Sequence, residues 1–242
     1  MRSSGNHLLS MIEDLLDLAK SETNDLQIQP HRVNLAQFLS EISRISGQDC
    51  AKKNLRFYTD FAANIPAVVV SDPSRLRQIL LNLLRNACKY TSAGHVLLKV
   101  SVLEQANGKA TLRFEVQDTG VGIPQDKIAK VFEAFFQIET SYALSEGGVG
   151  LGLAIVRELV RRLDGKINVS SVPKKGSAFQ VDLTMDVPES QTWLESYRIA
   201  DEVDRELVII SNDPMILETV SVLSARPHLK IHAYPEIMPF KV

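Results

Sequence analysis

Residues 72–90 carry a long amphipathic pattern that limits how the rest of the chain can fold. Asp72-Pro73 suits the start of a helix, because proline fits the first helical turn. On a 3.6-residue wheel, apolar side chains fall on one side and a polar stripe falls on the other. The apolar side must be buried against another layer, which leaves the polar stripe for solvent or a ligand. The stripe contains Arg75, Gln78, Asn82, Asn86 and Lys89, and the apolar side contains Leu76, Leu80, Leu83, Leu84 and Ala87.

Strand patterns lie next to one another along the chain, and helical patterns are interspersed among them. Asn107-Gly108 indicates a β-hairpin turn. Adjacent strand patterns favour an α+β fold, a two-layer sandwich in which about three helices cover one face of a mixed sheet of about five strands. The helices are predicted over residues 7–22, 34–53, 72–90, 125–136 and 150–163. The strands are predicted over residues 55–61, 67–70, 95–103, 111–117, 166–172, 177–185, 207–211 and 229–233.

The composition excludes some classes of protein. Apolar residues make up 45% and charged residues 23%, as in a globular protein. The net charge of −2 gives no support to a nucleic-acid partner. No apolar run approaches the roughly 20 residues that a membrane span needs. Cys50 and Cys88 make neither a disulfide framework nor a metal cluster, and we interpret them as buried small hydrophobes in a reducing compartment.

Two carboxamides on the polar stripe could hold a metal ion. Asn82 and Asn86 are one helical turn apart, and Lys89 follows three residues later. Carboxamide oxygens suit Mg²⁺ when phosphates supply the negative charge, and a lysine suits phosphate oxygens. An ordinary solvated helix face would show the same pattern.

Two glycine-rich segments could hold a nucleotide. Asp118 ends a strand and opens the segment 118–124, where a carboxylate can accept a hydrogen bond from an amine such as that of adenine. A tight turn capped by Asp118 is the alternative. Residues 147–153 open a helix, and free N–H groups at a helix start bind phosphate. This second segment is neither a Walker loop nor a Rossmann fingerprint.

Together, in this order, these segments resemble the histidine-kinase branch of the gyrase, heat-shock chaperone and mismatch-repair ATPase superfamily. The resemblance covers residues 34–186 and implies the Bergerat-type ATP-binding fold. Residues 77–91 resemble the N box of that family, 118–124 its first glycine box, 131–137 its phenylalanine box, 148–153 its second glycine box and 176–179 its last glycine box.

The resemblance implies roles for particular residues. The catalytic residues would be Asn82, Asn86 and Lys89, and Asn86 with Asn82 would hold Mg²⁺. Residues 137–149 would form a lid over ATP. The nucleotide would contact Asn86, Lys89, Tyr90, Asp118, Gly120, Gly122, Ile123, Phe136, Gly148, Val149, Gly150, Leu151, Gly152 and Leu153.

Some positions depart from the family pattern. Ala178 stands where many relatives have threonine, so a hydrogen bond near the adenine is expected to be lost or mediated by water. The ATPases of the superfamily carry a glutamate at the position of Asn82, and a carboxamide cannot act as a general base. We therefore expect slow hydrolysis and transfer of the γ-phosphoryl group to an external nucleophile.

In this family the nucleophile is a histidine in a His-Glu/Asp-x-x-x-Pro segment of a dimerising hairpin, and these 242 residues contain no such segment. His7 lies in a stretch that resembles the second helix of the hairpin. We therefore expect a fragment of a hybrid kinase. Its parts would be 1–25 (the incomplete hairpin), 26–188 (the catalytic ATP-binding domain), 189–205 (a linker) and 206–242 (the start of a degenerate receiver-like domain).

The resemblance also implies partners and a place in the cell. The expected partners are ATP and ADP, the histidine-bearing helix of the parent kinase, a response regulator or receiver domain, and a second copy of the parent in a homodimer, with no nucleic acid. The expected location is cytoplasmic, and the sequence leaves open whether the parent kinase has a membrane anchor. A nucleotide-binding signalling module without transfer activity and a superfamily ATPase remain as alternatives.

Overall fold

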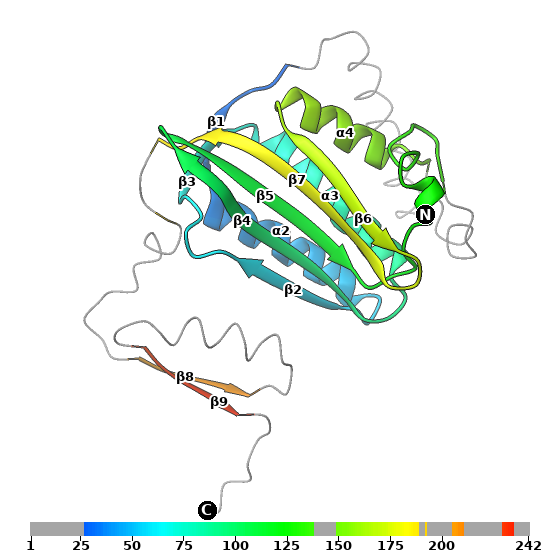
Figure 1. Cartoon of the computed structure of the whole chain (residues 1–242). Helices are drawn as coiled ribbons and strands as arrows, with labels where there is room; N and C mark the ends of the chain where they lie inside the picture. The colour runs from blue at the N-terminus through cyan, green and yellow to red at the C-terminus, as the bar shows by residue number, and fades with distance from the viewer. Residues whose placement is uncertain (1–26, 138–148, 189–191, 193–204, 211–228, 235–242) are drawn as a thin grey trace, which may run out of the picture. The chain divides into compact units, whose positions relative to one another are not determined.

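A computed structural model describes residues 27–137, 149–188, 192, 205–210 and 229–234 of the chain. Its contacts separate two units, Met1–Ser196 and Tyr197–Val242. Within its described part, the first unit has a seven-stranded mixed sheet, and three α-helices cover one face of that sheet (Figure 1). The predicted two-layer α+β fold is confirmed. The finer division at residues 25, 188 and 205 stays a prediction.

The sheet has the order β1-β3-β7-β5-β4-β2, and β6 also pairs with β7. Only β2 and β4 run parallel; the other pairs in this sheet are antiparallel. The prediction of about five strands was too low, partly because the edge strand β1 has only four residues and a mostly polar sequence. The strands are β1 (His31–Asn34), β2 (Arg56–Phe61), β3 (Val68–Ser71), β4 (His95–Ala106), β5 (Lys109–Asp118), β6 (Lys166–Val172) and β7 (Gly176–Asp186).

The helices are α2 (Leu35–Ala51), α3 (Pro73–Tyr90) and α4 (Gly152–Arg162). Asn34 caps α2 by accepting a hydrogen bond from the Gln37 N–H, and Asp72 caps α3 through the N–H groups of Ser74 and Arg75. The predicted apolar side of α3 is buried against the sheet, as is the inner face of the central strands. The core residues of α3 are Leu76, Ile79, Leu80, Leu83, Leu84, Ala87 and Cys88, and those of β4 and β5 include Val96, Leu98, Val100, Leu112, Phe114 and Val116.

The turn between β4 and β5 confirms the predicted hairpin. Asn107 and Gly108 both have positive φ, at 54° and 73°, which matches the two-residue turns that connect twisted strands. The predicted helix over residues 125–136 was wrong. Only Gln125–Lys127 forms a 3-10 helix, and later hydrogen bonds such as Lys130 N–H to Lys127 O span three residues.

Phe135 explains why this segment does not continue as a helix. Its φ of 65° lies outside the right-handed helical region. Its N–H donates to the Gly150 carbonyl at 3.1 Å, so its partner is distant in sequence rather than one turn back. Tertiary pairing with the start of the α4 region therefore replaces the regular helical ladder.

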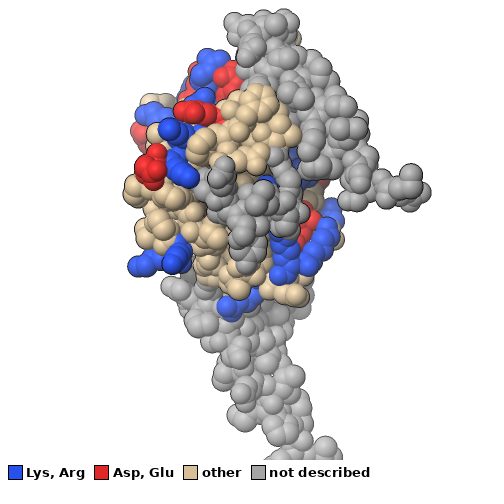
Figure 2. Space-filling view, turned by 90° about the vertical axis from the view of Figure 1, so that its right-hand side faces the viewer, with Lys and Arg blue, Asp and Glu red and all other residues tan. Residues whose placement is uncertain are grey.

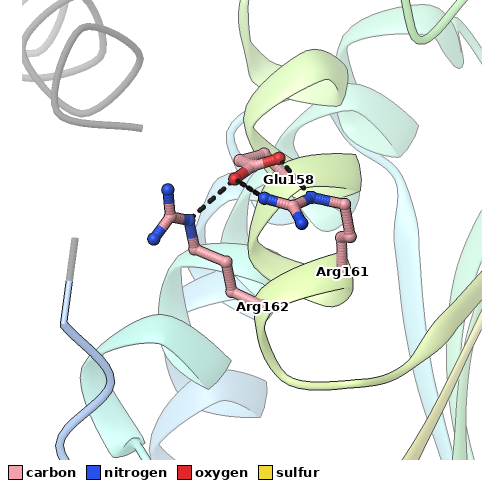
Figure 3. Close-up of polar contacts among 3 residues, drawn as sticks. All are labelled: Glu158, Arg161 and Arg162. Carbon is pink, nitrogen blue, oxygen red and sulfur yellow. Dashed lines mark hydrogen bonds and ion pairs between the residues drawn. The ribbon is translucent and has the colours of Figure 1, made fainter. Parts of the chain in front are cut away.

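The C-terminal end of α4 is charged. Glu158 accepts hydrogen bonds from both Arg161 and Arg162, at 2.7–2.9 Å (Figure 3). Basic side chains in a last helical turn also interact favourably with the helix dipole. Figure 2 shows one side of the molecule, where positive and negative side chains of the described residues are interspersed with uncharged ones.

The described part of the second unit contains β8 (Arg205–Ile210) and β9 (Leu229–Tyr234), which pair in parallel. The bounds of β8 and β9 overlap those of the strands predicted over residues 207–211 and 229–233. The assignment of this unit to a receiver-like domain stays a prediction. The predicted helix at 7–22 lies outside the described residues. Among the described helices, none is both long and apolar enough to cross a membrane.

Candidate functional site

A cleft lies where the last turn of α3 meets the ends of β5 and β7 and the first turn of α4. It contains about 620 Å³ of empty space, counting its open mouth. Apolar side chains predominate, with a few polar groups among them. The lining residues are Asn86, Ala87, Tyr90, Asp118, Val121, Gly122, Ile123, Val131, Phe136, Gln137, Leu153, Ser177 and Phe179.

Asp118 supplies the carboxylate of this cleft. It is the last residue of β5 and is paired in register with Ser177 on β7. Its Oδ1 accepts the Gly120 N–H at 2.8 Å, and Ser177 donates further hydrogen bonds to it. Burial raises the pKa of Asp118 above the usual carboxyl value, and these hydrogen bonds oppose that rise. Ionisation of the Asp118 carboxyl therefore costs free energy in the free domain, and a further hydrogen-bond donor would stabilise the ionised form.

Gly120 allows the backbone to pass against the end of α3. A methyl group at this position would lie 2.2 Å from the Tyr90 carbonyl oxygen, which is far inside any tolerated contact. The neighbouring Val121 N–H donates to the same carbonyl at 3.2 Å. The glycine thus holds the loop after Asp118 against α3, and the cleft is formed between them.

The polar end of the cleft brings together two segments that are far apart in the sequence. The Asn82 Nδ2 contacts the Gly152 carbonyl at 3.5 Å. A methyl group at Gly152 would lie 3.9 Å from the Asn82 side chain and 4.0 Å from Asn86 Nδ2. The predicted carboxamide pair therefore lies beside the first residue of α4.

The N-terminus of α4 has no side-chain cap among the described residues. The first N–H groups of a helix lack partners within the helix, so this end can bind an anion such as phosphate. The described residues contain no group of three His, Cys, Asp or Glu side chains that could hold a metal. Asn82 and Asn86 are accordingly the candidate protein ligands for a cation that shares its coordination with phosphate.

Several predicted site residues lie elsewhere. Lys89 does not line the cleft, and its ammonium lies 5.2 Å from the centre of the Tyr90 ring. Leu151 and Val149 pack in or against the core, which leaves their backbone as the part available to a ligand. Gly148 lies outside the described residues. Tyr90 does line the cleft, and burial raises the pKa of its phenol.

Sequence reasoning placed Gln137 only at the start of the expected lid, and it gave no individual site role to five other residues that line the cleft: Ala87, Val121, Val131, Ser177 and Phe179. The expectation that Ala178 causes a hydrogen bond near the adenine to be lost or mediated by water stays a prediction. Ser177 faces the cleft and bonds Asp118, while Ala178 lines a separate hollow. Strand alternation could have identified this, because residues 177 and 178 must point to opposite faces of the sheet.

The pKa of Asp118 makes the stability of the free domain depend on pH. Because the folded state raises this pKa, Asp118 contributes stability that is present at low pH and lost as pH rises from about 4 through the folded value. The melting temperature of the wild type, measured relative to that of Asp118→Asn, should therefore fall between pH 4 and pH 7. A difference that stays constant or grows with pH would contradict this assignment.

The chain is similar to a known family and to known proteins. Residues 71–187 match the family described as histidine kinase-, DNA gyrase B- and HSP90-like ATPases. Over 187 residues the chain is 36% identical to the autoinducer 2 sensor kinase/phosphatase LuxQ of Vibrio cholerae, an alignment that covers 77% of the chain and 22% of LuxQ. It is 34% identical over 215 residues to the aerobic respiration control sensor protein ArcB of Escherichia coli, covering 88% of the chain and 25% of ArcB.

Among solved structures, the chain is similar to full-length ShkA in complex with AMPPNP, with a TM-score of 0.74 and 29% identity. That alignment covers 98% of the chain and 47% of the ShkA chain. The mycobacterial sensor histidine kinase MprB is also similar, with a TM-score of 0.52, 26% identity, and coverage of 66% of the chain and 99% of the MprB chain. The chain spans 22% to 32% of the length of LuxQ, RpfC and ArcB.

Proposed function

Residues 71–187 of this chain belong to the family of histidine kinase-, DNA gyrase B- and HSP90-like ATPases, and on that premise we propose that the domain is a histidine protein kinase. It binds ATP with Mg²⁺ and transfers the γ-phosphoryl group to a histidine on a separate helix. One observation carries the proposal: a single cleft is lined by the half-buried Asp118 carboxylate and by Asn86, and Asn86 and Asn82 both lie beside the uncapped N-terminus of α4.

The Asp118 end suits an adenine. An exocyclic amine would donate to the carboxylate, which already accepts from Gly120 and Ser177. The apolar walls, among them Ile123, Val131 and Phe179, suit the faces of a purine ring. Guanine presents a carbonyl where adenine has its amine, so an acceptor would meet an acceptor and ATP would be preferred.

The opposite end suits a metal-bound triphosphate. The N–H groups that begin α4 would face phosphate oxygens, while Asn86 and Asn82 would hold Mg²⁺ through their carboxamide oxygens. Bound Mg²⁺ would neutralise the charge of the phosphates. The side chains present fit such an ion, because a neutral amide pair beside phosphate leaves the negative charge to the substrate.

Asn82 directs the chemistry away from hydrolysis. A carboxamide cannot remove a proton from water, so this side chain orients and coordinates without acting as a general base. Catalysis would depend on positioning and on charge neutralisation, as is usual for phosphoryl transfer. The nucleophile would be a histidine on a helical hairpin of the parent kinase, working as a homodimer, and a response regulator or receiver domain would then accept the phosphoryl group.

Transfer to histidine tests this function. Labelled ATP and Mg²⁺ should place acid-labile label on a synthetic helical hairpin that carries a phosphoacceptor histidine. Asn86→Ala should reduce the initial rate of labelling by roughly 100- to 1000-fold, because a group that stabilises charge in a transition state contributes about 2.7–4 kcal/mol. The rate of labelled-histidine formation is the measurement.

Asn168→Ala is the matched control, because Asn168 is an exposed carboxamide on β6 and is not among the residues that line the cleft. Its labelling rate should equal that of the wild type. Tight ATP binding with no labelled histidine would favour a signalling module that lacks transfer activity. Steady phosphate release that Asn86→Ala abolishes would favour an ATPase instead.

A further inference from the structure

The chain has two cysteines, and the structure brings them into contact. Cys50 lies in the last turn of α2 and Cys88 in the last turn of α3, and their Sγ atoms are 2.6 Å apart. Both are free and buried. Their burial matches the interpretation of two small core residues, but the direct contact between the sulfurs has no counterpart in the sequence pattern, since 38 positions separate them.

The separation is suited to bond formation. The two sulfurs are in direct contact, and a disulfide would join side chains that the packing of α2 on α3 already holds side by side. A second contact joins the same two helix ends. The side chain of Lys53, which follows α2, donates from its Nζ to the Cys88 carbonyl of α3 at 3.4 Å.

We propose that Cys50 and Cys88 form a redox-active dithiol that closes to an intramolecular disulfide and fastens the end of α2 to the end of α3. With a peroxide as oxidant, one thiolate attacks the peroxide oxygen and becomes a sulfenic acid, and one water leaves. The other thiol then attacks the sulfenic sulfur, the S–S bond forms, and a second water leaves. Two thiols lose two electrons and two protons, and hydrogen peroxide is reduced to two waters.

The pair is electrostatically prepared for the first step. The hydrogen bond from Cys88 lowers the pKa of Cys50, and the same interaction raises the pKa of Cys88. One thiol is thus favoured as the thiolate while the other keeps its proton until the second step. Both lie in the final turns of their helices, where local opening costs least and can admit a small oxidant.

The crosslink would act next to the cleft. Cys88 shares its helical turn with Asn86, Ala87 and Tyr90, all of which line the cleft. Because the sulfurs are already in contact, the disulfide should preserve the position of this turn and strengthen its attachment to α2. Oxidation is therefore expected to stabilise the domain and to leave nucleotide affinity within about threefold of the reduced value.

The reduced chain treated with hydrogen peroxide provides the test. Its mass should fall by two hydrogens, a non-reducing peptide map should join the peptides of Cys50 and Cys88, and the melting temperature should rise on the order of 10 °C. Dithiothreitol should reverse all three changes. Cys50→Ala and Cys88→Ala, each tested alone, should show no such rise.

Other results would overturn the proposal. Stable sulfinic or sulfonic acids on one cysteine, disulfide-linked dimers, or a lower melting temperature on oxidation would each exclude an intramolecular disulfide poised to form. A change of more than tenfold in AMPPNP affinity would show that the crosslink deforms the cleft. The mass and melting measurements use the unmutated chain and do not depend on the proposed kinase activity, so either proposal can fail while the other stands.

Discussion

Gly176→Ala should lower the free energy of unfolding by about 4 kcal/mol, a large part of the roughly 5–15 kcal/mol that stabilises a typical domain. Gly176 begins β7 with a φ of 105°, a region that L-residues rarely adopt. A methyl group there would lie 1.8 Å from the Asp118 carbonyl oxygen and 2.9 Å from the Thr119 Cα. Both neighbours are backbone atoms, so the collision can be relieved only by separating β7 from the residue that supplies the carboxylate of the cleft.

Gly108→Ala is the matched control. Gly108 also has a positive φ, at 73°, but a methyl group there would meet nothing within 4 Å. Its replacement should therefore cost only the backbone strain, on the order of 1 kcal/mol. Urea unfolding of both variants measures the difference. Equal losses of stability would show that the packing of Gly176 against Asp118 is not what requires a glycine.

Asp118→Ala should weaken ATP binding by roughly 10- to 150-fold while the fold is kept. A hydrogen bond to a charged group contributes about 1.5–3 kcal/mol, and each 1.4 kcal/mol is a factor of ten in affinity. The preference for ATP over GTP should fall by a similar factor, because the carboxylate is the group that distinguishes the two bases. Calorimetric titration with each nucleotide, in the presence of Mg²⁺, measures both effects.

Asp60→Ala provides the control for this second prediction. Asp60 is an exposed carboxylate on β2 that pairs with Lys99, and it does not line the cleft. Its removal should leave both nucleotide affinities unchanged. Unaltered ATP affinity in Asp118→Ala would mean that the base is recognised elsewhere.

The sequence predicted the parts of the site that depend on local periodicity. The 3.6-residue pattern of α3 separated its buried side from the stripe that carries Asn82 and Asn86. In the structure the predicted apolar side is buried, and Asn82 and Asn86 are not among the buried residues of the helix. Pro73 indicated the start of α3, and the helix predicted from residue 34 begins where expected; in the structure Asp72 and Asn34 cap the free N–H groups of these helices. The turn at Asn107-Gly108 followed from the backbone conformations those residues tolerate.

Features that depend on tertiary pairing were harder to predict. The segment after Gln125 has a helical composition, yet Phe135 bonds Gly150 instead of its own preceding turn. Ser177 reaches Asp118 only because β5 and β7 pair in one particular register. The contact between Cys50 and Cys88 likewise arises from the packing of α2 on α3, which no local pattern encodes.

Lys89 shows that a motif does not fix the path of a long side chain. Its contact with phosphate stays a prediction, and in the structure its ammonium lies over the Tyr90 ring and the residue does not line the cleft. A helical wheel gives the direction in which a side chain leaves the helix, whereas the final position of a long, flexible lysine also depends on its neighbours.

A crystal structure of the domain with AMPPNP and Mg²⁺ tests the central claim most directly. The adenine amine should lie within hydrogen-bonding distance of the Asp118 carboxylate, Mg²⁺ should contact the Asn86 carboxamide, and the phosphates should face the first N–H groups of α4. A nucleotide bound elsewhere, with side chains packed into the cleft at saturating AMPPNP, would contradict the account.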